Sequence, residues 1–205
     1  MNSKHLDDIK NIKIYENLLL LHGETYRALD WGSKESQLKR FEVLSEIGFD
    51  NGDSVLDVGC GLSDFNFWLE ERFPNLNYSG LDLSPKMIEK SNKRYPNCRF
   101  FLGSILDVDF GAKQFDFLVA SGIFVFREND PLGYMKKTIE RMYKLCIKGT
   151  AFNCLSNFTI NNSDAEFTAD PCDIFRFCKS ISSRVILRHD YHPNDFTIYL
   201  YKNHT

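Results

Sequence analysis

The chain has 205 residues, of which 43% are hydrophobic, 25 are Lys or Arg and 28 are Asp or Glu. This length fits one packed domain, and the net charge of −3 lacks the basic excess that is typical of nucleic-acid-binding proteins. The six cysteines include no CxxC pair, no apolar run is long enough to span a membrane, and the first residues lack the apolar core of a signal peptide. We therefore expect a cytoplasmic protein with reduced cysteines that binds neither nucleic acid nor membranes and has no zinc site.

Two helices are predicted in the first 50 residues. The first covers residues 5–22, and the second runs from Ser33 to Ile47, where apolar residues recur every three positions. Ser33 is suited to cap the second helix, because its hydroxyl can accept a free backbone N–H of the first turn. We expect residues 1–50 to form a helical extension or lid on a core of residues 51–205, within one domain that spans residues 1–205.

From residue 53 onward, the pattern alternates between apolar strands and helices. This alternation predicts a mostly parallel sheet with helices on both faces. The predicted strands are Ser54–Val58, Asn77–Leu81, Arg99–Leu102, Phe115–Ala120 and Thr150–Cys154. The predicted helices are Asp64–Phe73, Pro85–Tyr95, Pro131–Cys146 and Asp173–Ser180.

The C-terminal part of the pattern predicts a hairpin. Two apolar segments, Val185–Leu187 and Phe196–Tyr201, are separated only by residues 188–195. That connection is too short for a crossover between parallel strands, so the pair has to be antiparallel. The fold class is therefore α/β, a Rossmann-like, seven-stranded, mostly parallel sheet closed by an antiparallel hairpin.

A glycine-rich turn follows the first predicted strand and precedes a helix. Asp57, Gly59 and Gly61 lie in this segment, and Asp82 ends the next predicted strand. Glycines allow the backbone to approach a ligand closely, and a carboxylate at a strand end accepts hydrogen bonds from ribose hydroxyls. The segment therefore predicts a βαβ unit that binds a nucleoside.

These residues, together with Ala120-Ser121-Gly122 and the C-terminal hairpin, resemble the class I S-adenosylmethionine-dependent methyltransferases. The resemblance extends over nearly everything from Asp53 to Lys202. It implies S-adenosylmethionine as the cofactor and S-adenosylhomocysteine as its product. The cofactor-binding residues that it implies are Trp31, Gln37, Arg40, Asp57, Gly59, Gly61, Asp82, Leu83, Met87, Ser104, Ile105, Ser121 and Gly122.

Two positions depart from the family's pattern. Ser63 replaces the third glycine of the turn, which narrows the freedom of the backbone there. Ser104 stands where an acid usually faces the adenine amine, so its hydroxyl, a backbone carbonyl or Asp107 has to take that role. The roles of two further residues stay open. Arg40 pairs either with the cofactor carboxylate or with a nearby acid. Trp31 is either a contact of the lid with the cofactor or a buried anchor.

The acceptor site is expected at the edge where the parallel strands end. The candidate substrate-binding residues there are Phe124, Arg127, Asn157 and Tyr191. His189 and Asp190 form the candidate catalytic pair, because a histidine of near-neutral pKa can take a proton from a hydroxyl or amine. In the alternative interpretation, His189 is bonded to the backbone at a strand end; His192 lies in the same connection.

The predicted function is transfer of a methyl group to an O or N nucleophile of a small molecule, such as a sugar or a secondary metabolite. This chemistry depends on positioning and requires no particular catalytic residue, so the acceptor stays open. A metal site is not indicated, because Asp130 alone follows the fourth strand. One alternative is a non-catalytic relative that binds cofactor or a partner protein, and another is an NAD-dependent oxidoreductase, for whose second domain the chain has little room.

Overall fold

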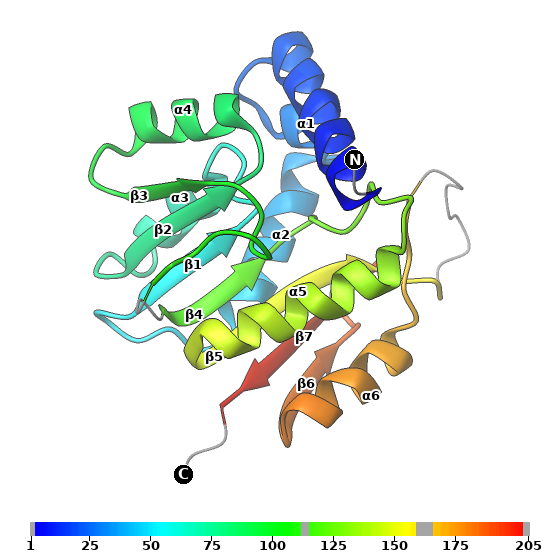
Figure 1. The fold of residues 1–205 in the computed structure, drawn as a ribbon. Coiled ribbons are helices and arrows are strands. Elements are labelled where there is room, and N and C mark those ends of the chain that lie inside the picture. The colour runs from blue at the N-terminus through cyan, green and yellow to red at the C-terminus, as the bar shows by residue number, and fades with distance from the viewer. Residues whose placement is uncertain (1–2, 112–114, 159–165, 203–205) are drawn as a thin grey trace.

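The structure is a computed structural model that describes residues 3–111, 115–158 and 166–202. Its centre is one seven-stranded sheet with the order β3-β2-β1-β4-β5-β7-β6 (Figure 1). The strands are β1 Ser54–Val58, β2 Asn77–Asp82, β3 Arg99–Leu102, β4 Phe115–Ala120, β5 Cys146–Leu155, β6 Arg184–Arg188 and β7 Asp195–Tyr201. The helices are α1 Ser3–His22, the short 3-10 helix η1 Tyr26–Leu29, α2 Lys34–Ser45, α3 Asp64–Glu70, α4 Pro85–Arg94, α5 Pro131–Leu145 and α6 Pro171–Ile181.

The pairing of the strands confirms the predicted fold class. Strands β1 to β5 pair in parallel, whereas β7 is antiparallel to both β5 and β6. One boundary differs from the sequence prediction, because β5 begins at Cys146 and not at Thr150. Cys146 already pairs with Phe115 of β4, and a shift in register follows between Phe115 and Phe117. The strand therefore starts directly where α5 ends.

The strand order places a crevice beside β1. β1 lies between β2 and β4, and the order of the strands reverses there, so the chain leaves β1 and β4 toward opposite faces of the sheet. Ligands of open α/β sheets bind at such a point, outside the carboxyl ends of the strands. Gly59, Asp82 and Ser121 all follow or end these strands, so this topology brings their segments together.

Helices bury an apolar core on each face of the sheet. The stripe of Met135, Ile139 and Met142 on α5 is fully buried with the apolar residues of α6, which is the packing role that its helical spacing predicts. On the other face, α2 and α3 bury a second cluster that includes Leu44 and Trp68. Figure 1 shows α5 in front of the sheet and α2 behind it.

Helix α1 lies across the carboxyl end of the sheet (Figure 1). Glu16 accepts a hydrogen bond from the Ser84 hydroxyl at 2.9 Å, which ties α1 to the start of α4. At the other end of α1, the carboxylate of Asp8 pairs with Arg127 at 2.5 Å, and both side chains are buried. Asp7 also accepts the backbone and side-chain N–H groups of Asn129. Polar contacts therefore join α1 to segments that follow β2 and β4.

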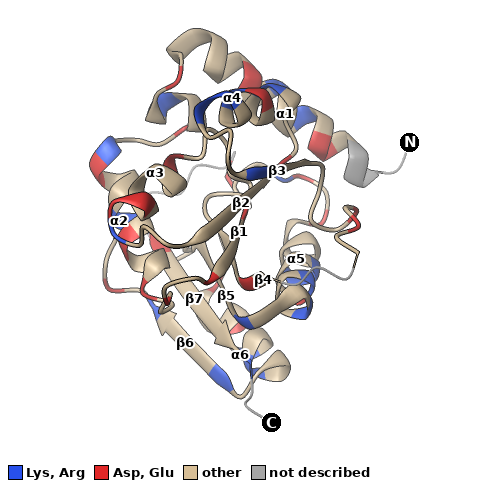
Figure 2. Ribbon diagram, turned by 90° about the vertical axis from the view of Figure 1, so that its left-hand side faces the viewer, with Lys and Arg blue, Asp and Glu red and all other residues tan. Residues whose placement is uncertain are grey.

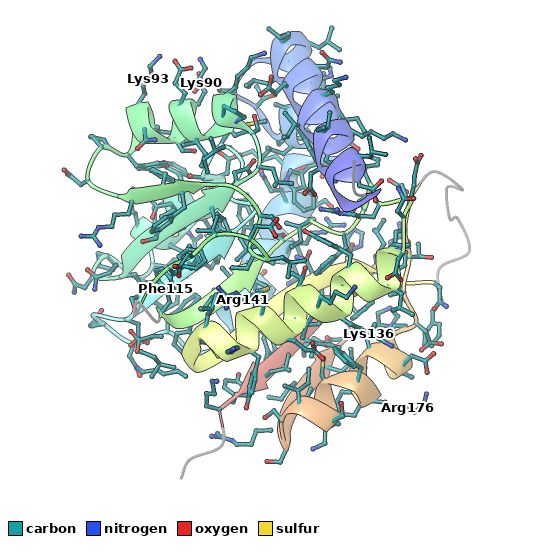
Figure 3. All side chains as sticks on the ribbon, viewed as in Figure 1. Lys90, Lys93, Phe115, Lys136, Arg141 and Arg176 are labelled. Atoms are coloured by element: carbon teal, nitrogen blue, oxygen red, sulfur yellow. The ribbon has the colours of Figure 1, made fainter. Side chains whose placement is uncertain are left out.

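The charged residues are mixed over the elements. In the view of Figure 2, Lys and Arg alternate with Asp and Glu, and neither sign forms a continuous stripe along the ribbon. Lys90 and Lys93 point outward from α4 (Figure 3), where they pair with Glu24 and Glu89. Over the described part of the chain, no helix combines the length and the hydropathy that a membrane crossing requires.

The buried pair between α1 and the β4–α5 connection can be tested by stability. Arg127→Met leaves the carboxylate of Asp8 buried without its partner, so we expect the free energy of unfolding to fall by about 3–5 kcal/mol. The double variant Asp8→Leu/Arg127→Met removes both charges, so its free energy of unfolding should fall clearly less than that of the single variant. Urea unfolding of the two variants checks this, and an equal loss in the single and double variants would contradict the pairing.

Candidate cofactor and acceptor site

A cavity of about 430 Å³ opens at the carboxyl end of the sheet. This volume lies in the range of small-molecule sites, about 300–1,000 Å³. Its walls come from α1, the 29–32 connector, α2, the turns after β1, β2, β3 and β4, the end of β5 and the β6–β7 connection. Segments from the whole length of the chain therefore share one site.

Most of the predicted site residues line this cavity. Those in its wall are Trp31, Arg40, Asp57, Gly59, Gly61, Asp82, Leu83, Met87, Ser104, Ile105, Ser121, Gly122, Phe124 and Arg127. Those outside it are Gln37, Asn157, His189, Asp190 and Tyr191. Gln37 instead donates a hydrogen bond to Asp64 of α3 at 3.2 Å, and the Tyr191 hydroxyl bonds that of Thr197 at 2.7 Å. Both side chains are therefore engaged in packing between elements.

The turn after β1 needs its two glycines. Gly59 and Gly61 have φ values of +76° and +52°, in the left-handed region that favours glycine. A Cβ atom on Gly59 would lie 2.3 Å from Cγ2 of Ile123, and one on Gly61 would lie 2.6 Å from Cδ2 of Leu29. Side chains from the β4 end and from the N-terminal connector thus pack directly on this turn.

Ser63, at the position of the third glycine, also adopts a left-handed conformation, with φ +58°. Its hydroxyl donates to Oγ of Ser91 at 2.9 Å, and the Ser91 hydroxyl donates to the carbonyl of Gly61 at 3.0 Å. A serine therefore reproduces the backbone shape of the glycine and adds a bridge between the turn and α4. The departure from the family's pattern leaves the turn intact.

Asp82 holds this turn against the end of β2. One carboxylate oxygen accepts the N–H of Gly61 and the other accepts that of Ser84, each at 2.8 Å. Burial raises the pKa of Asp82, while these N–H groups act to lower it. The helix cap of α4 is Ser84, whose hydroxyl accepts the N–H of Met87. The carboxylate of Asp82 therefore lies in the cavity wall in a fixed orientation.

The segment after β3 forms another part of the wall. The Ser104 hydroxyl accepts the N–H of Leu106 at 3.2 Å, and Asp107 is not in the cavity wall. Arg141 of α5, labelled in Figure 3, donates to the carbonyls of Ile105 and Val108 and so links this segment to α5. Ser104 and Ile105 line the cavity together with Leu83 and Met87. The sequence contained no signal for the Arg141 contact.

Arg40 pairs with an acid that sequence reasoning did not consider. Its guanidinium forms a buried ion pair with Asp195 of β7, not with a glutamate of its own helix. It also lies 4.9 Å from the ring of Trp31, and Trp31 packs 3.1 Å from the position of a Cβ on Gly122. Trp31 is thus both a cavity wall and a support for Arg40.

The predicted catalytic pair, His189 and Asp190, lies outside the cavity wall. Asp190 is exposed and accepts two hydrogen bonds from Arg188, at 2.7 and 3.0 Å. His189 packs beside the rings of Phe158 and Phe196, outside the cavity. His192 lines the cavity instead, and its Nδ1 lies 2.7 Å from Oδ2 of Asp195. The spacing of three residues between a histidine and an acid was the signal that sequence reasoning missed.

Asp57 is a buried acid in the cavity wall. Its Oδ2 accepts the hydroxyl of Tyr78 at 2.7 Å. Burial raises the pKa of Asp57 to about 7, against the lowering effect of the Tyr78 hydrogen bond and with a further rise from the charge of Asp82. Asp57 therefore changes its charge near neutral pH.

Among the described residues, no group of three or more His, Cys, Asp or Glu side chains is arranged to hold a metal ion.

Comparisons with known proteins agree with this geometry. A family model described as a methyltransferase domain matches residues 55–149. A protein of Mycobacterium tuberculosis named a putative methyltransferase is 31% identical over 159 residues, which are 73% of this chain and 93% of that protein. The trans-aconitate 2-methyltransferase of Escherichia coli is 32% identical over 68 residues, 33% of this chain and only 27% of that enzyme.

Solved structures share the fold at low sequence identity. The magnesium protoporphyrin IX methyltransferase from Synechocystis, solved with bound S-adenosylhomocysteine, superposes with a TM-score of 0.68 at 11% identity and covers 99% of this chain and 100% of that one. A plantazolicin methyltransferase, also solved with S-adenosylhomocysteine, gives 0.62 at 15% identity over 94% of this chain and 90% of that one. With the relative of 31% identity, the family-model match and the sheet topology, this chain belongs to the class I S-adenosylmethionine-dependent methyltransferases.

Proposed function

We propose that this protein transfers the methyl group of S-adenosylmethionine to an O or N nucleophile of a small molecule. The observation that carries the proposal is the Asp82 carboxylate, which is held in the cavity wall by the N–H groups of Gly61 and Ser84. A rigid carboxylate at the end of the second strand, beside a glycine turn, suits the two hydroxyls of a ribose. The cavity volume of about 430 Å³ supports a small acceptor.

The adenosine half of the cofactor fits the wall around Asp82. Leu83, Met87 and Ile105 supply apolar surface for the base, and Ser104 supplies a hydroxyl at the same place. The Ser104 oxygen already accepts a hydrogen bond from Leu106, so it is oriented by its own turn. In this proposal Asp82 binds the ribose and Ser104 takes the role of the acid that the family usually has.

The methionine half of the cofactor fits the part of the wall that Asp57 and Arg40 form. Asp57 is a buried acid there, and an ammonium group beside it would favour its ionised form. Arg40 provides positive charge for a carboxylate, and its Nε is buried without a hydrogen-bond partner among the described residues. We therefore assign Asp57 to the cofactor ammonium and Arg40 to its carboxylate.

The chain's contribution to catalysis is positioning in a dry site. The cofactor supplies a methyl group on a positively charged sulfonium, and the reaction needs nucleophile, carbon and sulfur in line. Trp31 offers an aromatic face to that charge, an interaction worth about 0.5–2 kcal/mol. Helix α1 covers the cavity with Asn11, Ile12 and Tyr15, which limits the entry of water. Holding the reactants in this way can contribute about 7–11 kcal/mol.

The charged side chains of the cavity wall limit the charge that an acceptor can carry. Asp30, Asp57, Asp82 and Glu166 line the cavity, whereas its two arginines, Arg40 and Arg127, are each paired with a buried acid. A polycarboxylate acceptor such as the one named for the Escherichia coli relative would meet repulsion here. The proposed acceptor is therefore neutral or cationic. The non-catalytic alternative gains no support from Ser63, because this residue reproduces the glycine conformation.

Calorimetry tests the cofactor assignment. We expect wild-type protein to bind S-adenosylhomocysteine, and Asp82→Asn to weaken binding at least about tenfold, because hydrogen bonds to a charged group contribute about 1.5–3 kcal/mol. Asp173→Asn is a matched control, since Asp173 is an exposed acid on α6 that pairs with Arg176. Absence of binding by wild-type protein, to both S-adenosylmethionine and S-adenosylhomocysteine, would overturn the proposed function.

Asp57 gives a second prediction, which depends on pH. Because burial raises its pKa to about 7, the folded protein holds this proton more tightly than the unfolded chain, and ionised Asp57 costs stability once the pH rises above its unfolded pKa. Asp57→Asn removes that cost. We expect the Tm gain of this variant over wild type to increase from pH 5 to pH 8, while its affinity for S-adenosylhomocysteine falls. Scanning calorimetry at both pH values is the measurement, and a pH-independent difference in Tm would contradict it.

A further inference from the structure

Four residues of the cavity wall lie outside the set that we assign to the cofactor, and we call them the acceptor wall. Helix α1 contributes Asn11 and Tyr15, the connection between β4 and α5 contributes Phe126, and the segment before α6 contributes Glu166. Because the cofactor takes other parts of the cavity, these four residues form a surface that is available to the methyl acceptor.

The three segments of the acceptor wall are in contact with one another. Asn11 and Tyr15 are four residues apart on α1, so they lie on the same face of the helix. The ring centroids of Tyr15 and Phe126 are 6.0 Å apart. One residue before Phe126, the carbonyl of Val125 accepts the N–H of Phe167 at 2.8 Å. This bond places the segment before α6 beside the β4–α5 connection.

Asn11 has a polar atom that nothing in the described part of the chain satisfies. Its side chain is only 8% exposed, and its Oδ1 is buried without a hydrogen-bond partner among the described residues. An amide oxygen that has lost water and gained no donor is unfavourable. Since Asn11 lies in the cavity wall, a bound molecule with an N–H or O–H group can supply the missing donor.

Glu166 gives the acceptor wall a negative charge. An ionised carboxylate only accepts hydrogen bonds, so it calls for the same kind of partner as the Asn11 oxygen does. Burial raises the pKa of Tyr15, and the charges of Asp30, Asp82 and Glu166 raise it further. The Glu166 carboxylate therefore acts on the part of the wall where the Tyr15 hydroxyl lies.

The positive groups of the cavity wall are already paired. Its two arginines form buried ion pairs with Asp8 and Asp195, and no lysine is among the described residues that line the cavity. The rings of Tyr15 and Phe126 add aromatic faces, which attract cations. The acceptor wall thus combines hydrogen-bond acceptors, negative charge and aromatic surface, which together suit a positively charged donor.

The sign of this charge also matters for the reaction, because methyl transfer to an amine moves positive charge from sulfur to nitrogen. The lone pair of the neutral amine attacks the methyl carbon, the carbon–sulfur bond breaks, and its electron pair stays on sulfur as a neutral thioether. The nitrogen becomes a methylated ammonium. A carboxylate beside this nitrogen stabilises the charge that develops in the transition state.

We propose that the methyl acceptor is a primary or secondary amine and that Glu166 and Asn11 bind its N–H groups, an inference that rests on the proposed function. The ammonium form of the amine releases one proton to water before the attack. The remaining N–H donates to the acceptor wall, which leaves the nitrogen lone pair free to reach the methyl group. An alcohol of the same shape brings no positive charge, and a carboxylic acid brings a negative one.

The test uses the full chain, S-adenosylmethionine and a panel of primary and secondary amines, with alcohols and carboxylic acids that carry the same aryl or alkyl groups, and measures S-adenosylhomocysteine. Wild-type protein should methylate amines and not the matching alcohols or acids. Glu166→Gln should lower kcat/KM for amines at least about tenfold, because hydrogen bonds to charged groups are the stronger ones. Its affinity for S-adenosylhomocysteine should not change.

Asn11→Leu separates binding of the acceptor from a role in the fold. We expect kcat/KM for amines to fall about two- to tenfold, the effect of one neutral hydrogen bond. The Tm should not fall, because Oδ1 has no partner among the described residues of the free protein. A loss of Tm without a loss of kcat/KM would show a purely structural role and would contradict the assignment of Asn11.

Glu140→Gln is the matched control, because Glu140 is an exposed glutamate of α5 outside the cavity wall. Glu166→Asp keeps the charge and should retain more activity toward amines than Glu166→Gln. The inference is overturned if the protein binds cofactor but methylates no amine, or if Glu166→Gln leaves kcat/KM for amines unchanged. Failure of wild-type protein to bind cofactor is a different result, which overturns the proposed function itself.

Discussion

The site depends on one carboxylate between two backbone amides. Asp82 accepts the N–H of Gly61 with one oxygen and that of Ser84 with the other, so it joins the turn after β1 to the start of α4. The glycine turn can then pack under Leu29 and Ile123, and α4 begins where the cavity needs its wall. A buried acid is costly unless it is hydrogen-bonded, and here the bonds that offset this cost also shape the cofactor site.

The N-terminal helices join this core through long-range polar contacts. Arg127 pairs with Asp8 of α1, and Arg40 of α2 pairs with Asp195 of β7, and all four side chains are buried. Removing one partner of such a pair leaves a buried charge, which is strongly destabilising. Two buried ion pairs therefore attach the N-terminal helices to segments much later in the chain.

The ion pair between Arg40 and Asp195 also belongs to the cavity wall. Arg40 and Asp195 both line the cavity, and His192 lies beside them with Nδ1 at 2.7 Å from Oδ2 of Asp195. The same contacts thus attach α2 to β7 and form part of the cavity wall.

The sequence by itself determined the sheet, the hairpin and the nucleoside turn, because these follow from local periodicity, connection length and glycine spacing. Gly59, Gly61 and Asp82 were all found in this way, and all line the cavity. Only the tertiary structure decided the partners that lie far apart along the chain, such as Asp195 for Arg40. It also decided that the hairpin connection turns His192 toward the cavity and His189 toward Phe158, which no local pattern encodes.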